Sequence, residues 1–166
     1  ADSHYIMTTT TANAGPVMTH LEYYLQVVWP DLDVRLTSIT DQFAVAAVAG
    51  PAARQLLESL DSDITFANQA MPFMAWRDGQ IGGMPAQVFR ISFSGELAYE
   101  VATPADHGHA MWEMLLEAGA DLGVMPYGTE ALTILRTGKD HFVMGSEADG
   151  RATADDLGLG GMLSSK

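Results

Sequence analysis

The stretch that decides the fold is RISFSGELAYEVATP, residues 90–104. Apolar residues alternate with small and polar ones on both sides of Ser94-Gly95, and this pattern predicts two β-strands joined by a tight turn. Two carboxylates interrupt the pattern: Glu96 lies beside the glycine of the turn, and Glu100 lies inside the second strand. A turn accommodates Glu96 readily, whereas an acid within a strand requires its own explanation.

The alternation assigns Glu100 to one face of its strand. The opposite face is expected to contact the core through Leu97, Tyr99 and Val101. Glu100 lies between Ala98 and Ala102, so it faces either solvent, which the pattern alone favours, or a cavity. The alanines leave room for a flat ligand, and the two carboxylate oxygens suit a pair of parallel N–H donors such as those of an aminopyrimidine ring. If Glu100 faces a cavity, we expect it to recognise a ligand and not to act as an acid–base catalyst.

Strands and helices are intermixed on either side of this stretch. Strands are expected at 4–11, 34–40, 43–48, 73–76, 86–93 and 97–102, and helices at 16–28, 52–60, 104–118 and 130–136. Thr103 and Thr129 are the expected N-caps of the last two helices. Because the elements do not alternate as repeated βαβ units, the sequence predicts an α+β fold.

The composition narrows the class of protein. With 166 residues, 48% of them hydrophobic and 17% charged, the chain can bury a core. A net charge of −13 argues against a nucleic-acid partner. No apolar run approaches the roughly 18 residues of a membrane span, and the first residues lack the features of a signal peptide. The absence of cysteine excludes disulfides and thiolate sites and fits a cytoplasmic location.

The sequence contains no recognisable motif for metal binding or for nucleophilic catalysis. His107 and His109 are two residues apart in a predicted helix, and residues with this spacing do not share a helical face. The HExxH, Walker and GxGxxG patterns are absent. We therefore expect no metal site and no catalytic residue in this chain.

Several motifs resemble those of the glycine-cleavage aminomethyltransferases, the T-protein family. FSGELAYEV at 93–101 resembles the family's YTGExGxE element. Further elements follow the family's order: VAGP at 48–51, LR at 135–136, and GSEAD at 145–149 with a later threonine and GL pair. One branch is especially similar, the folate-binding regions of the α subunits of heterotetrameric sarcosine oxidases. The similar segments are MTTTTANA at 7–14, WPDLDV at 29–34, RISFSGELAYE at 90–100 and PYGTEALTILR at 126–136.

This resemblance implies a T-protein-like folate-binding fold that is incomplete at both ends. Residues 1–166 would form part of one such region, with a candidate boundary to a C-terminal subdomain near 138–166. The complete enzymes demethylate sarcosine oxidatively to glycine, hydrogen peroxide and 5,10-methylenetetrahydrofolate. The implied partners of this region are reduced folate, as tetrahydrofolate, and the other subunits. FAD, FMN and NAD would belong to the whole enzyme, and this chain alone would be inactive.

The resemblance also assigns roles to individual residues. Glu100 matches the family glutamate that binds the pteridine ring. Phe93 matches an aromatic residue that lines the folate site and is usually tyrosine in the transferases, so a hydroxyl is missing here. The transferases carry an acid shortly after a VxNAxN segment, but residues 9–17 contain neither Asp nor Glu, and Val17 lies near that position. A transferase mechanism that uses this acid is therefore not supported.

Two alternatives to an oxidase subunit remain open. The chain could be part of a stand-alone folate-dependent aminomethyltransferase, although the missing acid near Val17 argues against it. It could also be a packing module that binds no folate and serves subunit assembly only.

Overall fold

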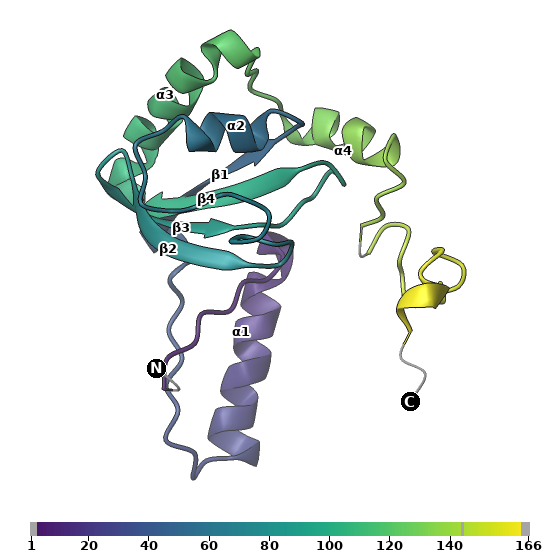
Figure 1. Ribbon diagram of the computed structural model, residues 1–166. Helices are drawn as coiled ribbons and strands as arrows, with labels where there is room; N and C mark the ends of the chain where they lie inside the picture. Colours follow the sequence, from purple (N-terminus) through teal and green to yellow (C-terminus); the bar gives the residue numbers. More distant parts are fainter. Residues whose placement is uncertain (1–2, 144, 164–166) are drawn as a thin grey trace. The chain divides into compact units, whose positions relative to one another are not determined.

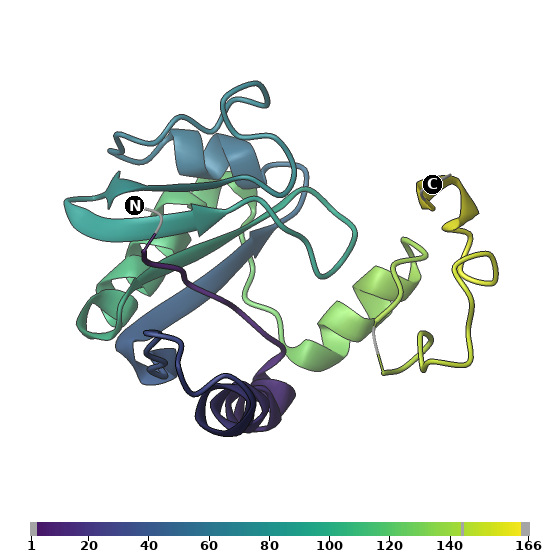
Figure 2. The same ribbon diagram turned by 90° about the horizontal axis from the view of Figure 1, so that it is seen from below.

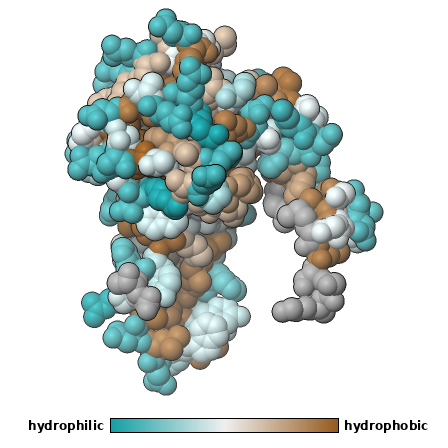
Figure 3. All heavy atoms as spheres, viewed as in Figure 1, coloured by the Kyte–Doolittle hydropathy of each residue, from teal (hydrophilic) through white to brown (hydrophobic). Residues whose placement is uncertain are grey.

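The computed structural model describes residues 3–143 and 145–163, and the chain divides into two compact units, Ala1–Thr40 and Asp41–Lys166. The first unit contains a short 3-10 turn, Thr11–Asn13, helix α1, Ala14–Tyr23, and a π-helical continuation, Tyr24–Val28. The helix expected at 16–28 is thus confirmed. Apolar atoms lie along this helix in Figure 3, and none of its residues is fully buried. The strands predicted at 4–11 and 34–40 are wrong, because both segments are irregular and pair with no other strand.

The second unit is built on a four-stranded antiparallel sheet (Figures 1 and 2). Its strands are β1, Phe43–Ala49, β2, Trp76–Ile81, β3, Met84–Phe89, and β4, Ala98–Pro104. Their order in the sheet is β1-β4-β3-β2. The central strand β4 therefore pairs with β1 on one side and with β3 on the other. The two-residue turn between β2 and β3 is Gly82-Gly83, whose positive φ angles of +58° and +75° favour glycine.

The described residues of this unit form three α-helices: α2, Ala53–Glu58, α3, Gly108–Ala118, and α4, Thr129–Thr137. Short 3-10 turns lie at Thr40–Gln42, Ala105–His107, Ala120–Leu122 and Gly160–Met162. Helices α2 and α3 lie over the same face of the sheet (Figure 1). An antiparallel sheet with helices on one face confirms the predicted α+β class.

The hydrophobic core lies between the sheet and helices α2 and α3. Tyr99 and Val101 of β4 are almost fully buried there, as the alternation predicts. They pack with Leu57 of α2 and Met111 of α3. Removing this apolar surface from water is the main stabilising contribution to the unit. Because successive side chains of a strand point to opposite faces, the burial of Tyr99 and Val101 directs Glu100 to the other face of the sheet.

The structure corrects several local predictions. Segment 90–97 is a wide loop and not a tight turn, because the backbone of Arg90 bonds to Met74 and Ala75 instead of β4. Both predicted helix N-caps are wrong. Thr103 lies in β4, where its Oγ1 donates to a backbone carbonyl. The N-cap of α4 is a glycine, and Thr129 is already the first helical residue. The strand predicted at 73–76 begins only at its last residue. The predicted subdomain boundary near 138–166 stays a prediction.

Candidate ligand-binding site

Glu100 and Phe93, the two site residues predicted from the sequence, line one small pocket. Its volume is about 40 Å³. The pocket is formed by β1, by the 90–97 loop with the start of β4, and by the segment that leads into α4. Its lining residues are Ala47, Ala49, Ile91, Phe93, Ser94, Ala98, Tyr99, Glu100, Tyr127 and Leu132. Segments far apart in the sequence therefore meet around the carboxylate.

Strand pairing determines what surrounds Glu100. In the register of β1 with β4, Ala47 lies opposite Glu100 and Ala49 lies opposite Ala98. On the other side of β4, Phe89 of β3 is the partner of Glu100. Directly paired residues project to the same face of a sheet. Small alanine side chains consequently leave open space on the β1 side of the carboxylate.

The side chain of Glu100 is half-buried and lacks a polar partner. Among the described residues its carboxylate forms no hydrogen bond and no ion pair. Burial raises the pKa of the Glu100 carboxyl above its ordinary value. Two carboxylate oxygens without donors in a partly desolvated position are costly for the protein. The two oxygens of Glu100 can therefore accept hydrogen bonds from water or from another donor outside the described residues.

Two aromatic side chains lie at the edges of this pocket. Phe93 is 54% exposed and Tyr127 is 39% exposed. Both rings offer a flat apolar surface beside the carboxylate, and Tyr127 adds a phenolic hydroxyl. With Leu132 of α4 they form the walls that lie outside the sheet. Sequence reasoning gave no role to Tyr127 or Leu132, although both belong to the motif-like segment PYGTEALTILR.

Three motif residues, Arg136, Glu147 and Glu96, form ion pairs. Arg136 forms a bidentate pair with Glu147, with N–O distances of 3.0 and 3.1 Å, and Glu147 also accepts a hydrogen bond from the Val143 backbone. The hydrogen bonds from Arg136 and Val143 lower the pKa of Glu147 to about 2. Lys139 Nζ lies 2.9 Å from Glu96 Oε2. The sequence predicted Arg136 and Glu147 as motif residues without predicting that they contact each other.

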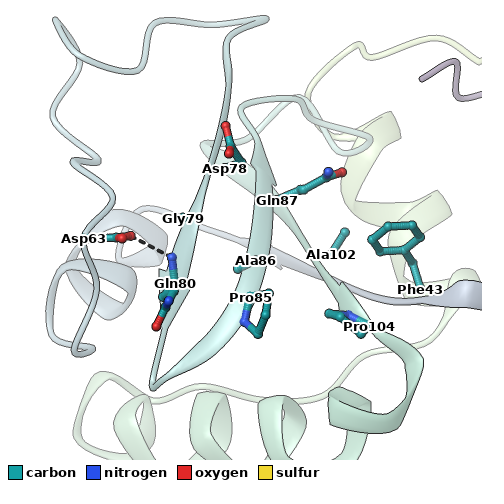
Figure 4. A pocket seen from close by; sticks show the side chains of 10 residues that line it. All are labelled: Phe43, Asp63, Asp78, Gly79, Gln80, Pro85, Ala86, Gln87, Ala102 and Pro104. Atoms are coloured by element: carbon teal, nitrogen blue, oxygen red, sulfur yellow. Dashed lines mark hydrogen bonds between the residues drawn. The ribbon is translucent and has the colours of Figure 1, made fainter. Parts of the chain in front are cut away.

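A second, larger hollow lies elsewhere on the same unit (Figure 4). It measures about 360 Å³ and is lined by residues from β1 to β4 and by Asp63, whose carboxylate accepts a hydrogen bond of 2.7 Å from the Gln80 backbone. Neither Glu100 nor Phe93 lines it. Across residues 3–143 and 145–163, no group of three or more His, Asp or Glu side chains could hold a metal ion.

The second unit is an α+β domain with a small pocket that the Glu100 carboxylate lines together with the aromatic residues Phe93 and Tyr127. The chain belongs to the GCVT N-terminal domain family, whose model matches residues 1–166. This match confirms the family resemblance that the motifs indicated. In addition, no helix in the described part of the chain is long and apolar enough to cross a membrane.

Similar curated proteins include two sarcosine oxidase α subunits. The protein from Rhizobium meliloti (strain 1021) is 51% identical over 166 residues, which is 98% of this chain and 16% of the relative. The protein from Corynebacterium sp. (strain U-96) is 43% identical over 96% of this chain and 17% of the relative. An aminomethyltransferase from Geobacillus sp. (strain WCH70) is 32% identical over 96% of this chain and 42% of the relative. The chain thus spans about a sixth of the length of these sarcosine oxidase relatives.

Proposed function

We propose that this chain is the tetrahydrofolate-binding portion of a sarcosine oxidase α subunit. The observation that carries the proposal is the half-buried carboxylate of Glu100, which has no protein donor among the described residues. The similarity to sarcosine oxidase α subunits over almost the whole chain supports this assignment over other members of the family.

The chemistry of the pocket fits the aminopyrimidine edge of a pteridine. Such an edge carries adjacent N–H donors, and the two oxygens of Glu100 accept a parallel pair of hydrogen bonds. A volume of about 40 Å³ is far below the roughly 300–1,000 Å³ of pockets that enclose a small ligand. The pocket therefore receives only the edge of the ring. The rest of the ligand would lie against exposed aromatic surface, which Phe93 and Tyr127 provide.

In the proposed reaction the role of this chain is to hold tetrahydrofolate and to orient its pteridine ring. Tetrahydrofolate supplies the amine nitrogens that take up the one-carbon unit released when sarcosine is oxidised. Glu100 fixes the orientation of the pteridine, and Phe93 and Tyr127 limit its movement. Holding a nucleophile beside a reactive imine or formaldehyde accelerates their reaction mainly through proximity. Oxidation of sarcosine to glycine with formation of hydrogen peroxide, and binding of FAD, FMN and NAD, are assigned to other parts of the enzyme and its other subunits.

Titration with folinic acid, a stable reduced folate, tests this proposal. The complete gene product, with any subunits that co-purify, should bind folinic acid saturably. Glu100→Gln should weaken binding by about 5- to 150-fold, because one acceptor becomes a donor and about 1–3 kcal/mol is lost. Glu113→Gln, an equivalent change at an exposed position of α3, is the matched control and should leave binding unchanged.

Two results would reject the proposal. Equal affinity of the Glu100→Gln variant and the unmodified protein would remove Glu100 from the site. No binding by the complete gene product would favour the packing module that binds no folate. A stand-alone aminomethyltransferase would bind folate but would produce no peroxide from sarcosine, so peroxide measurement on the complete gene product together with its co-purifying subunits separates it from the oxidase.

A further inference from the structure

The two sides of the Glu100 pocket are held in place by different forces. Ala47, Ala49 and Glu100 belong to paired strands, so the backbone ladder of β1 and β4 fixes their positions. Leu132 belongs to α4, which is not part of the sheet and contains no buried residue. Two apolar residues of this helix are largely exposed, Ile134 at 72% and Leu135 at 52%. Hydrophobic burial therefore contributes little to the position of α4.

The C-terminal end of α4 is instead attached to the 90–97 loop by an ion pair. Lys139 lies just after Gly138, the residue that ends α4, and its Nζ lies 2.9 Å from Glu96 Oε2. The backbone N–H of Lys139 donates to the carbonyl of Arg136, so the lysine is tied to the last helical turn. Glu96 also accepts a hydrogen bond of 3.2 Å from the Leu97 N–H, which orients its carboxylate.

The backbones of the two segments approach closely at the same place. A Cβ atom at Gly95 would lie 3.0 Å from Lys139 Cβ and 3.2 Å from His141 Cβ. The φ angle of Gly95 is +77°, a conformation that glycine adopts without steric cost. A side chain here would separate the loop from the end of α4. The glycine thus provides the short distance across which the ion pair forms.

The 90–97 loop and the segment entering α4 each contribute a wall of the pocket. Phe93 lies three residues before Glu96 on the loop, and Tyr127 and Leu132 lie on the α4 side. We propose that Glu96 and Lys139 are positioning residues: their ion pair holds α4 on the loop and so sets the separation of the two walls that contact the ligand. This inference rests on the proposed ligand site, and it gives Glu96 a role that the sequence did not predict.

A double-mutant cycle on the complete gene product tests the proposal. Glu96→Gln removes the charge and keeps an acceptor for the Leu97 N–H, while Lys139→Met removes the charge and keeps the apolar stem. Each change should weaken folinic acid binding by about two- to fivefold, the range expected for an exposed ion pair. The double variant should bind no more weakly than either single variant, because the same interaction is lost. Lys139→Arg should retain affinity.

Two further measurements separate positioning from a general loss of stability. In about 1 M KCl, where the screening length is near 3 Å, unmodified and variant proteins should bind alike. Hydrogen exchange of the amides in residues 129–137 should quicken in both single variants and remain slow in the control Glu113→Gln, which alters an exposed pair on α3.

The results of these experiments either support or overturn the positioning role of Glu96 and Lys139. Additive losses in the double variant, or unchanged exchange in α4, would overturn the proposal. If the unmodified protein binds no folinic acid, the proposed function fails, and exchange in α4 still decides whether Glu96 and Lys139 hold the helix.

Discussion

Acidification should weaken folate binding because it protonates Glu100. Burial raises the pKa of this carboxyl above its ordinary value of 4.5, so the change begins at a higher pH than for an exposed glutamate. The ionised form accepts hydrogen bonds at both oxygens, whereas the protonated form carries an O–H donor. Protonation therefore replaces one favourable hydrogen bond to the ligand with a contact between two donors.

The magnitude follows from the number of hydrogen bonds affected. A hydrogen bond to a charged group contributes about 1.5–3 kcal/mol, which corresponds to a factor of about 10 to 150 in the dissociation constant. Below the pKa of Glu100 the dissociation constant should rise about tenfold for each pH unit until this limit is reached. Above the pKa it should be independent of pH.

Calorimetric titration of the complete gene product with folinic acid, from about pH 5 to pH 8, measures this dependence. The Glu100→Gln variant is measured in the same buffers, because it reveals any titration of the ligand itself. The unmodified protein should lose affinity on acidification and the variant should not. Parallel pH profiles for the two proteins would refute the assignment of Glu100 as the ionised acceptor.

The same raised pKa affects the stability of the ligand-free protein. A glutamate whose pKa is raised by folding binds its proton more tightly in the native state than in the unfolded state. Its contribution to stability is therefore fully present below the unfolded pKa of 4.5 and is lost as the pH rises through the folded pKa. At pH 7 without folate, Glu100→Gln should raise the melting temperature while it weakens binding. A lower melting temperature would mean that the native protein stabilises the carboxylate.

Three other changes test individual contacts. Tyr99→Phe removes the buried hydroxyl that accepts a 3.0 Å hydrogen bond from Arg54 Nε, and it should lower the free energy of unfolding by about 1–2 kcal/mol in urea titrations. Gly95→Ala forces a φ of +77° on a residue with a Cβ atom, and should cost about 1–2 kcal/mol by the same measurement. Glu147 has a pKa of about 2, so its pairing with Arg136 stabilises the protein above about pH 4.5 and is lost as the pH falls through 2. Glu147→Gln should remove that part of the acid dependence of unfolding, followed by circular dichroism.

The sequence predicts the sheet well where a strand has a buried face. Alternation identified β4 and placed Tyr99 and Val101 in the core, and the structure confirms both. The prediction failed at 4–11 and 34–40, where a composition rich in β-branched residues suggested strands, but these segments have no pairing partner. A strand is stable only when its backbone hydrogen bonds are satisfied by a neighbour, and local composition contains no information about that neighbour.

The pocket was predictable only in part, because local sequence contains no information about which distant segments lie beside Glu100. Alternation limited Glu100 to solvent or a cavity, and motif resemblance selected the cavity. Tyr127 and Leu132 come from a segment more than 25 residues further along the chain, and no periodic pattern connects them with Glu100. The wide 90–97 loop was also missed, because Arg90 directs its backbone bonds to Met74 and Ala75. Such contacts between distant segments are decided by tertiary structure.

In the proposed site, Glu100 would bind the ligand and Glu96 would position one side of the pocket, so one short stretch would supply both roles. Glu100 belongs to an inner strand of the sheet, so pairing with β1 and β3 fixes its backbone position even without a ligand. Glu96 lies on the adjoining loop and pairs with Lys139 at the end of a helix that buries no residue. The strand ladder of β1 and β4 holds the sheet side of the pocket, whereas in our proposal the α4 side depends on an ion pair that salt can weaken. Higher ionic strength should consequently weaken the contacts between the α4 side of the pocket and the ring faces of a ligand more than it weakens the contacts of Glu100.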